Sequence, residues 1–263
     1  MPSTRQFADV GVFGSELLPA TSTIDSVSAI TVGFVTEPDA VRPLLPYHFE
    51  PAQRCVVRVS HMRYLGIDYL AGRGYNVVSV GVPVQLAADP SVAGSYNIVI
   101  WEGLSHAVNL GRELQGYAKI YGEVPDAVES AEGGFDFECS EYGTPLVRGS
   151  VRELEPYSDE QLSRLQEASN EAYSLGWKYI PGPKLTSDPD CDYATKVSNP
   201  MFYERAWSAK GTLAFCDVAW EAAPVSKRIL DRLRQLPVIK PTRGFVGQGS
   251  ASAPRATVQR LAG

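Results

Sequence analysis

Lysine is the scarcer basic residue in this chain, and its first occurrence is the position best suited to chemistry. The sequence has 24 basic residues, only seven of which are lysines, and no lysine precedes Lys119. A lysine amine can lose its proton and attack a carbonyl, whereas an arginine guanidinium stays charged. Lys119 is therefore our candidate nucleophile. Composition alone favours a simpler alternative, a surface lysine in an arginine-rich chain.

Two further residues near Lys119 could move protons. Tyr117 lies two residues before it, so both side chains point to one face if this segment is extended. The Tyr117 phenol could donate a proton or orient a bound group, and a packing role fits equally well. His106 could act as a general base if its imidazole is neutral. A hydrogen-bonded histidine at the start of a helix is the simpler interpretation.

Two segments rich in β-branched residues are expected to form strands that carry the other binding side chains. They are residues 54–64 (RCVVRVSHMRY) and 75–86 (YNVVSVGVPVQL). Side-chain alternation predicts which residues face a pocket. These are Arg58, Ser60, Met62, Tyr75 and Val77. Arg58 could bind a carboxylate through its guanidinium, although an exposed or structural arginine is the more common outcome.

Composition and charge exclude several classes of protein. Hydrophobic residues make up 44% of the chain and charged residues 21%, which is typical of a globular protein. The net charge of -6 argues against binding to nucleic acid or to an anionic membrane. No apolar run is long enough to cross a bilayer, and residues 1–21 do not resemble a secretory signal. We therefore expect a cytoplasmic protein.

The cysteines and histidines predict neither disulfides nor a metal site. The four cysteines, Cys55, Cys139, Cys191 and Cys216, are widely separated, so reduced thiols are expected. The three histidines have no common metal-ligand spacing to a partner, so we expect no metal.

The order of elements predicts one α+β domain spanning residues 1–263, with an irregular lead-in over residues 1–24. We expect a large, mainly antiparallel sheet or barrel with a few helices outside it. Strands are predicted at 30–36, 54–64, 75–86, 96–101, 119–124, 132–142, 146–154 and 211–220. Helices are predicted at 37–45, 158–175 and 226–236, with a short helix or turn at 104–115. Residues 243–261 are expected to form a loosely alternating tail or closing strand.

Several segments, in order and at similar spacing, resemble the acetoacetate decarboxylase family over about residues 28–240. The main one is GRELQGYAK at residues 111–119, which resembles the run leading to that family's imine-forming lysine. The others are PDAVRPLLP (38–46), YNVVSVGVP (75–83), the strand 96–101 and WKYIP (177–181). The resemblance implies a mainly antiparallel fold, no cofactor, homo-oligomers and an imine at Lys119. Glu113 belongs to the same run and is a candidate substrate-binding residue, although a structural ion pair suits it better.

The chain departs from the decarboxylase pattern where charged residues are expected. Ile120 stands where a second lysine usually follows the imine-forming one. Val77 and Ser60 stand at acidic pocket positions, Val27 or a neighbour replaces an arginine, and Ala118 replaces a proline. A free lysine has a pKa of about 10.4, so Lys119 must be activated, here mainly by burial. The resemblance thus implies that imine chemistry persists with a changed substrate or later step.

The sequence therefore predicts a Schiff-base lyase that acts on a keto acid by decarboxylation or another carbon–carbon cleavage. The alternative within the family is an aldolase-dehydratase that condenses a 2-oxo acid such as pyruvate with an aldehyde. A different class also remains open, a non-catalytic homologue that binds a small molecule. In each case the expected partner is a small keto acid or aldehyde, without nucleic acid or membrane.

Overall fold

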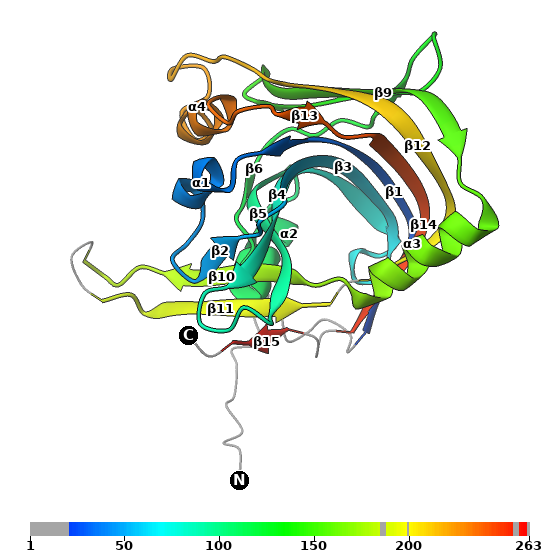
Figure 1. Ribbon diagram of the computed structural model, residues 1–263. Coiled ribbons are helices and arrows are strands. Elements are labelled where there is room, and N and C mark those ends of the chain that lie inside the picture. The colour runs from blue at the N-terminus through cyan, green and yellow to red at the C-terminus, as the bar shows by residue number, and fades with distance from the viewer. Residues whose placement is uncertain (1–20, 185–187, 199, 255–257, 262–263) are drawn as a thin grey trace.

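A single curved sheet dominates the protein. The computed structural model describes residues 21–184, 188–198, 200–254 and 258–261. Fifteen strands in this part of the chain follow the order β15-β11-β10-β5-β4-β3-β1-β14-β12-β9-β8-β7, with β13, β2 and β6 paired to β1, β4 and β5. Figure 1 shows the sheet bending strongly, with α3 beside β12 and with α1 and α4 toward the opposite end.

The strands are β1 (Thr21–Thr36), β2 (Phe49–Pro51), β3 (Cys55–Ile67), β4 (Arg73–Leu86), β5 (Ala93–Glu102), β6 (Lys119–Tyr121), β7 (Val128–Glu129), β8 (Phe135–Glu141), β9 (Thr144–Pro156), β10 (Ser174–Ile180), β11 (Cys191–Val197), β12 (Met201–Phe215), β13 (Lys240–Pro241), β14 (Gly244–Pro254) and β15 (Gln259–Arg260). The helices are α1 (Pro38–Val41), α2 (Ser105–Leu110), α3 (Asp159–Glu171) and α4 (Lys227–Arg234). Short turns are the 3₁₀ segments η2 (Arg42–Leu44) and η3 (Asp68–Leu70) and the π-helical segment η4 (Gly111–Gln115).

The predicted fold class is confirmed, and the sheet is open. Its path ends at β15 on one side and at β7 on the other, so these strands do not close into a barrel. Most neighbours are antiparallel, but β5 runs parallel to both β6 and β10. Parallel neighbours need a crossover between them. The chain from β5 to β6 crosses over through α2 and η4, so the crossover lies beside the end of β5.

Alternation along the central strands separates a hydrophobic core from a more polar face. On β3, Val57 and Val59 are buried in the core, whereas Ser60 lies on the opposite face. On β4, Val78 and Val80 are fully buried in the same core. Residues i and i+2 of a strand share a face, so β-branched residues at every second position give the sheet one continuous apolar side.

Several boundaries differ from those predicted. Residues 21–24 belong to β1 and pair with β14, so they are not part of an irregular lead-in; residues 1–20 lie outside the described residues. The helix predicted at 158–175 begins as expected with a Ser158–Gln161 capping box but ends at Glu171, because residues from Ser174 onward form β10. The expected loose tail is the long strand β14, paired on both sides. Strand β11 and the first half of β12 were not predicted.

Strand β5 is anchored to the start of α4 through buried hydrogen bonds. Trp101 on β5 is fully buried, and its Nε1 donates to Ser226 Oγ at 2.9 Å. The backbone N–H groups of Val225 and Ser226 donate to the two carboxylate oxygens of buried Glu141, each at 2.9 Å. A carboxylate thus satisfies backbone donors at the beginning of this helix, where no intrahelical acceptor exists.

Replacing Glu141 by alanine is expected to lower the free energy of unfolding by about 3 kcal/mol, because it leaves the buried Ser226 N–H and the part-buried Val225 N–H without their acceptors. Denaturant unfolding measures this loss. Glu138→Ala is the matched control on the same strand, because Glu138 pairs with Arg148 at the surface. That variant should change stability by less than about 1 kcal/mol. Equal losses in the two variants would contradict the anchoring role of Glu141.

No helix in the described part of the chain combines the length and the apolar character needed to span a bilayer.

Candidate active site

A cavity of about 430 Å³ lies on the polar face of the sheet, opposite the core. Side chains from β3, β4, β5 and β6 form part of its wall, together with residues of α2 and η4. Binding pockets for small organic molecules commonly have volumes of this order. The cavity is therefore the candidate site, and its chemistry depends on which groups reach it.

Lys119 lies at the wall of this cavity. It is the first residue of β6, and its parallel pairing places it beside Ile100 of β5. Lys119 is only 8% exposed, and it lines the cavity together with Ile100. Nζ also lies 5.7 Å from the centre of the Tyr75 ring, within the range of a cation–π contact. The predicted nucleophile is thus a buried amine at a cavity wall.

Glu102 is the direct partner of this amine. Lys119 Nζ donates to Glu102 Oε2 at 2.6 Å and to the backbone oxygen of Ala107 at 3.2 Å. Glu102 is the last residue of β5 and is fully buried. Its second oxygen, Oε1, has no hydrogen-bond partner among the described residues. The sequence predicted burial around Lys119, and the structure adds a buried carboxylate as the direct partner of its amine.

Burial sets the protonation of the groups around the amine. Burial raises the pKa of Glu102, and the neighbouring Lys119 ammonium partly offsets this effect. The pKa of Tyr75 is raised well above its usual value, first by burial and then by the charge fields of Tyr69 and Glu102. Burial likewise raises the pKa of Tyr64. The Tyr64 and Tyr75 hydroxyls therefore stay protonated near neutral pH and can donate hydrogen bonds.

Gly111 lets the lysine side chain pass close to the backbone. A β-carbon on Gly111 would lie 2.6 Å from Lys119 Cδ and 2.7 Å from Cε, much closer than a van der Waals contact. Gly111 begins the π-helical segment η4, a rare conformation that is often found at functional sites. Position 111 of the GRE run must therefore be glycine, because any larger residue would collide with the Lys119 side chain.

Strand β10 holds this turn in place. Trp177 donates its backbone N–H to Gly116 O at 2.8 Å, just after η4. Gly116 has φ +71°, which favours glycine, and a β-carbon there would meet the Lys178 backbone N at 2.6 Å. Arg112 Nη1 donates to the backbone oxygen of Lys119 at 3.1 Å. The WKYIP segment therefore holds the end of the GRE run in place through a backbone hydrogen bond and close backbone packing.

The structure brings together most of the residues that the sequence singled out. Those that line the cavity are Ser60, Met62, Tyr75, Val77, Tyr117 and Lys119. Val27 lines it as well, so three of the four positions at which the resemblance expects charged groups face this space, whereas Ile120 packs against the core. Uncharged side chains occupy each of them.

Three predicted site residues lie elsewhere. Arg58 shares a face of β3 with Ser60 but is exposed and is not part of the cavity wall. His106 is exposed in α2, where its ring lies 6.2 Å from the Tyr69 ring. Glu113 is exposed in η4, because in a helical segment it points away from its neighbours Gly111 and Leu114 that line the cavity. None of the three reaches the space beside Lys119.

Sequence reasoning missed Glu102 as a site residue. The predicted strand ended at residue 101, whereas β5 continues to Glu102. Alternation along β5 puts Trp101 in the core and Glu102 on the cavity side with Ile100. Glu102 also pairs directly with Val77, the position where the resemblance expects a glutamate. Glu102 thus places a carboxylate beside that position but on the neighbouring strand, and extending the alternation by one residue would have found it.

Lys119 is the only lysine, arginine, aspartate or glutamate among the described residues that line the cavity. The remaining polar groups are serines, tyrosines, Asn97 and Gln115. No group of three or more histidine, cysteine, aspartate or glutamate side chains in the described ranges could hold a metal ion. The site therefore has one charged pair and a wall of neutral hydrogen-bonding groups.

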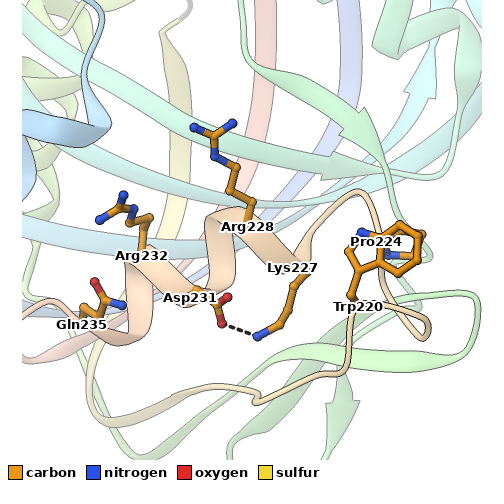
Figure 2. A pocket seen from close by; sticks show the side chains of 7 residues that line it. All are labelled: Trp220, Pro224, Lys227, Arg228, Asp231, Arg232 and Gln235. Atoms are coloured by element: carbon orange, nitrogen blue, oxygen red, sulfur yellow. Dashed lines mark hydrogen bonds and ion pairs between the residues drawn. The ribbon is translucent and has the colours of Figure 1, made fainter.

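A second hollow lies beside α4, and it lacks the buried amine found in the cavity. Figure 2 shows the side chains that line it, and none of them is buried. They are Trp220, Pro224, Lys227, Arg228, Asp231, Arg232 and Gln235. Lys227 pairs with Asp231 at 2.6 Å, so its charge is already compensated. An exposed hollow of this kind offers no desolvated nucleophile.

Comparison with known proteins assigns the chain to a family. The family model for acetoacetate decarboxylase (ADC) matches residues 13–259. The chain therefore belongs to the acetoacetate decarboxylase family, and the resemblance read from the sequence is confirmed. No curated protein matches the sequence.

Solved structures show the same fold at low sequence identity. The acetoacetate decarboxylase from Legionella pneumophila aligns with TM-score 0.72 and 17% identity, covering 93% of this chain and 90% of that one. An acetoacetate decarboxylase-like enzyme from Sphingomonas wittichii RW1 aligns with TM-score 0.68 and 15% identity, covering 93% and 94%. The enduracididine biosynthesis enzyme MppR, complexed with the condensation product of pyruvate and imidazole 4-carboxaldehyde, aligns with TM-score 0.68 and 16% identity, covering 93% and 90%. These neighbours therefore show that the chain shares their fold.

Proposed function

We propose that this protein is a carbon–carbon lyase that forms an imine between Lys119 and the keto group of an oxo acid. The observation that carries the proposal is the position of Lys119, which lies at the wall of the cavity and whose Nζ donates to Glu102 Oε2 at 2.6 Å. Family membership supports the same chemistry.

An imine explains why a lysine is needed and why a metal ion or organic cofactor is not. The amine condenses with a ketone to give an iminium ion, which accepts the electron pair released when a carbon–carbon bond breaks or an α-proton leaves. In this cavity the neutral donors Ser60, Ser79 and Asn97 can hold the rest of the substrate. Tyr117 and Tyr75 line the same cavity. Either phenol could donate a proton to the carbon of the enamine that remains after the bond breaks.

A second candidate is the aldol condensation and dehydration of a 2-oxo acid with an aldehyde. Two observations favour it. The cavity volume of about 430 Å³ exceeds the needs of a single small keto acid and leaves room for two reactants. The described part of its wall also lacks the acidic and arginine side chains that the decarboxylase pattern places there.

Reductive trapping tests the imine. The protein is incubated with acetoacetate or with pyruvate, reduced with borohydride, digested and analysed by mass spectrometry. We expect one reduced adduct on the peptide that contains Lys119, and no adduct at Lys178 or Lys210, because neither lines the cavity. An adduct spread over the exposed lysines, or none with any keto compound, would favour a binding protein without imine chemistry.

Two assays separate the candidate reactions. Release of CO₂ from acetoacetate would support decarboxylation. Growth of ultraviolet absorbance from a conjugated 2-oxo acid, formed from pyruvate and an aromatic aldehyde, would support condensation with dehydration.

A further inference from the structure

Glu102 is a buried group whose charge the family resemblance does not explain. Its carboxylate is 0% exposed, it contacts the reacting nitrogen directly, and one of its oxygens has no partner among the described residues. Leaving a buried carboxylate charged is costly unless a cation stays beside it. Among the described residues, the cavity wall offers no cation besides Lys119, so the charge of Glu102 is balanced by whatever group Lys119 becomes during the reaction.

We propose that Glu102 is the proton partner of Lys119, a catalytic residue that accepts a proton from the ammonium, returns it when water leaves, and then serves as the counter-ion of the iminium. This inference rests on the proposed imine chemistry and names the acid–base group that performs it.

The steps balance without any group from outside the site. The ammonium passes one proton to Glu102, which leaves a neutral amine beside a neutral carboxylic acid. The amine nitrogen attacks the carbonyl carbon, and a proton moves from nitrogen to oxygen to give a carbinolamine. Glu102 then protonates the departing hydroxyl, so that the carbon–oxygen bond breaks, water leaves and an iminium forms beside the carboxylate. The sum is ammonium plus ketone giving iminium plus water.

The net charge of the lysine–glutamate pair is zero at every stage of this sequence. The pair is ammonium with carboxylate, then amine with acid, then iminium with carboxylate. A desolvated site favours such a route, because at no stage does the lysine–glutamate pair itself carry an uncompensated charge in a low-dielectric environment. If the iminium next loses an α-proton to Glu102, the resulting enamine and acid are again neutral.

The other titratable groups near Glu102 are tyrosines. Tyr75 on β4 and Tyr64 on β3 both experience its charge, and burial raises the pKa of each phenol. Tyr117 before β6 and Tyr69 in η3 also line the cavity. Phenols with raised pKa values keep their protons through the neutral range, so Tyr64 and Tyr75 cannot take the place of Glu102 as a base there.

The test measures the yield of trapped iminium as a function of pH. Cyanoborohydride reduces iminium ions in preference to carbonyls, so its adduct at Lys119 reports the protonated imine. Wild-type protein should trap acetoacetate or pyruvate evenly between about pH 6 and 8. Glu102→Gln should trap about 100-fold more slowly at pH 7, which is within the range for loss of a positioned acid–base group. Trapping by the Glu102→Gln variant should recover as the pH is lowered. A buried imine that has no anion beside it becomes protonated to the iminium only at lower pH.

Two further variants separate a proton role from a merely structural one. Glu102→Asp keeps the carboxylate and should keep the wild-type pH profile at a reduced rate. Glu153→Gln makes the same change in the exposed Lys210–Glu153 pair and should alter nothing. If Glu102→Gln folds poorly, Glu102→Ala with added formate provides the readout, because formate should restore trapping.

The outcomes distinguish this inference from the proposed function. A wild-type rate and pH profile in Glu102→Gln would overturn the role of Glu102 and leave the imine intact. A loss of equal size at every pH in the Gln, Asp and formate-treated Ala variants would overturn it as well. A wild-type protein that forms no adduct with either compound would overturn the proposed function itself, and the role of Glu102 with it.

Discussion

Replacing Lys119 by methionine is expected to abolish adduct formation and to reduce turnover by at least about 10⁴-fold, because no other described residue of the cavity wall can form an imine. Methionine keeps most of the side-chain volume and removes the amine. Mass spectrometry after reduction and the two product assays measure the effect. Retained turnover in this variant would eliminate the mechanism.

The same substitution should also destabilise the protein in a pH-dependent way. Without Lys119, the buried Glu102 has no cation beside it, and removing one partner of a buried pair costs about 3–5 kcal/mol. Burial already raises the folded-state pKa of Glu102, and loss of the ammonium raises it further. The folded protein then holds a proton that the unfolded chain releases above its usual carboxyl pKa. Stability therefore falls as pH rises from about 5 toward 8.

Unfolding experiments at several pH values check this sign. Adding Glu102→Gln to Lys119→Met should remove the pH dependence, because the double variant has no buried carboxyl at this position. Lys210→Met is the surface control, since Lys210 and Glu153 are both exposed, and it should cost less than about 1 kcal/mol. A Lys119→Met protein as stable as wild type at pH 8 would contradict the burial of the pair.

Replacing Gly111 by alanine is expected to reduce activity by about 100-fold while leaving the protein folded. The added methyl group would overlap Lys119 Cδ and Cε, at 2.6 and 2.7 Å, so the flexible lysine must move. Displacement of a reacting group by about 1 Å can cost about 100-fold in rate. The φ of -65° and ψ of -39° at Gly111 lie in the right-handed helical region, so alanine can adopt the local backbone conformation.

This prediction separates positioning of the lysine from stability of the fold. Turnover, the trapped adduct and the unfolding midpoint are measured on one preparation. Gly103→Ala is the matched control, because its nearest contact is an ordinary 3.4 Å to Gly122 O. An active Gly111→Ala protein would show that Lys119 has another route into the cavity. An unfolded one would show that the methyl group displaces backbone.

The sequence by itself determined the family, the fold class and the candidate nucleophile. Those conclusions depend on local features. β-Branched residues at alternate positions specify the central strands, and the run 111–119 has glycines and a lysine at fixed spacing. The Ser158–Gln161 capping box is likewise a local hydrogen-bond pattern, so the start of α3 was predictable. Neighbouring residues along the chain are enough to encode such features.

The tertiary structure alone decided what surrounds Lys119. Glu102 reaches it because β5 and β6 are parallel neighbours, and Val77 lies beside Glu102 because β4 and β5 are antiparallel neighbours. Strand register of this kind is set by long-range packing. Arg58 shows the same limit. Alternation along β3 puts it on the same face as Ser60, but the cavity does not extend as far along the strand as Arg58. Side-chain types predict possible chemistry, and only the pairing of distant strands determines which of them meet.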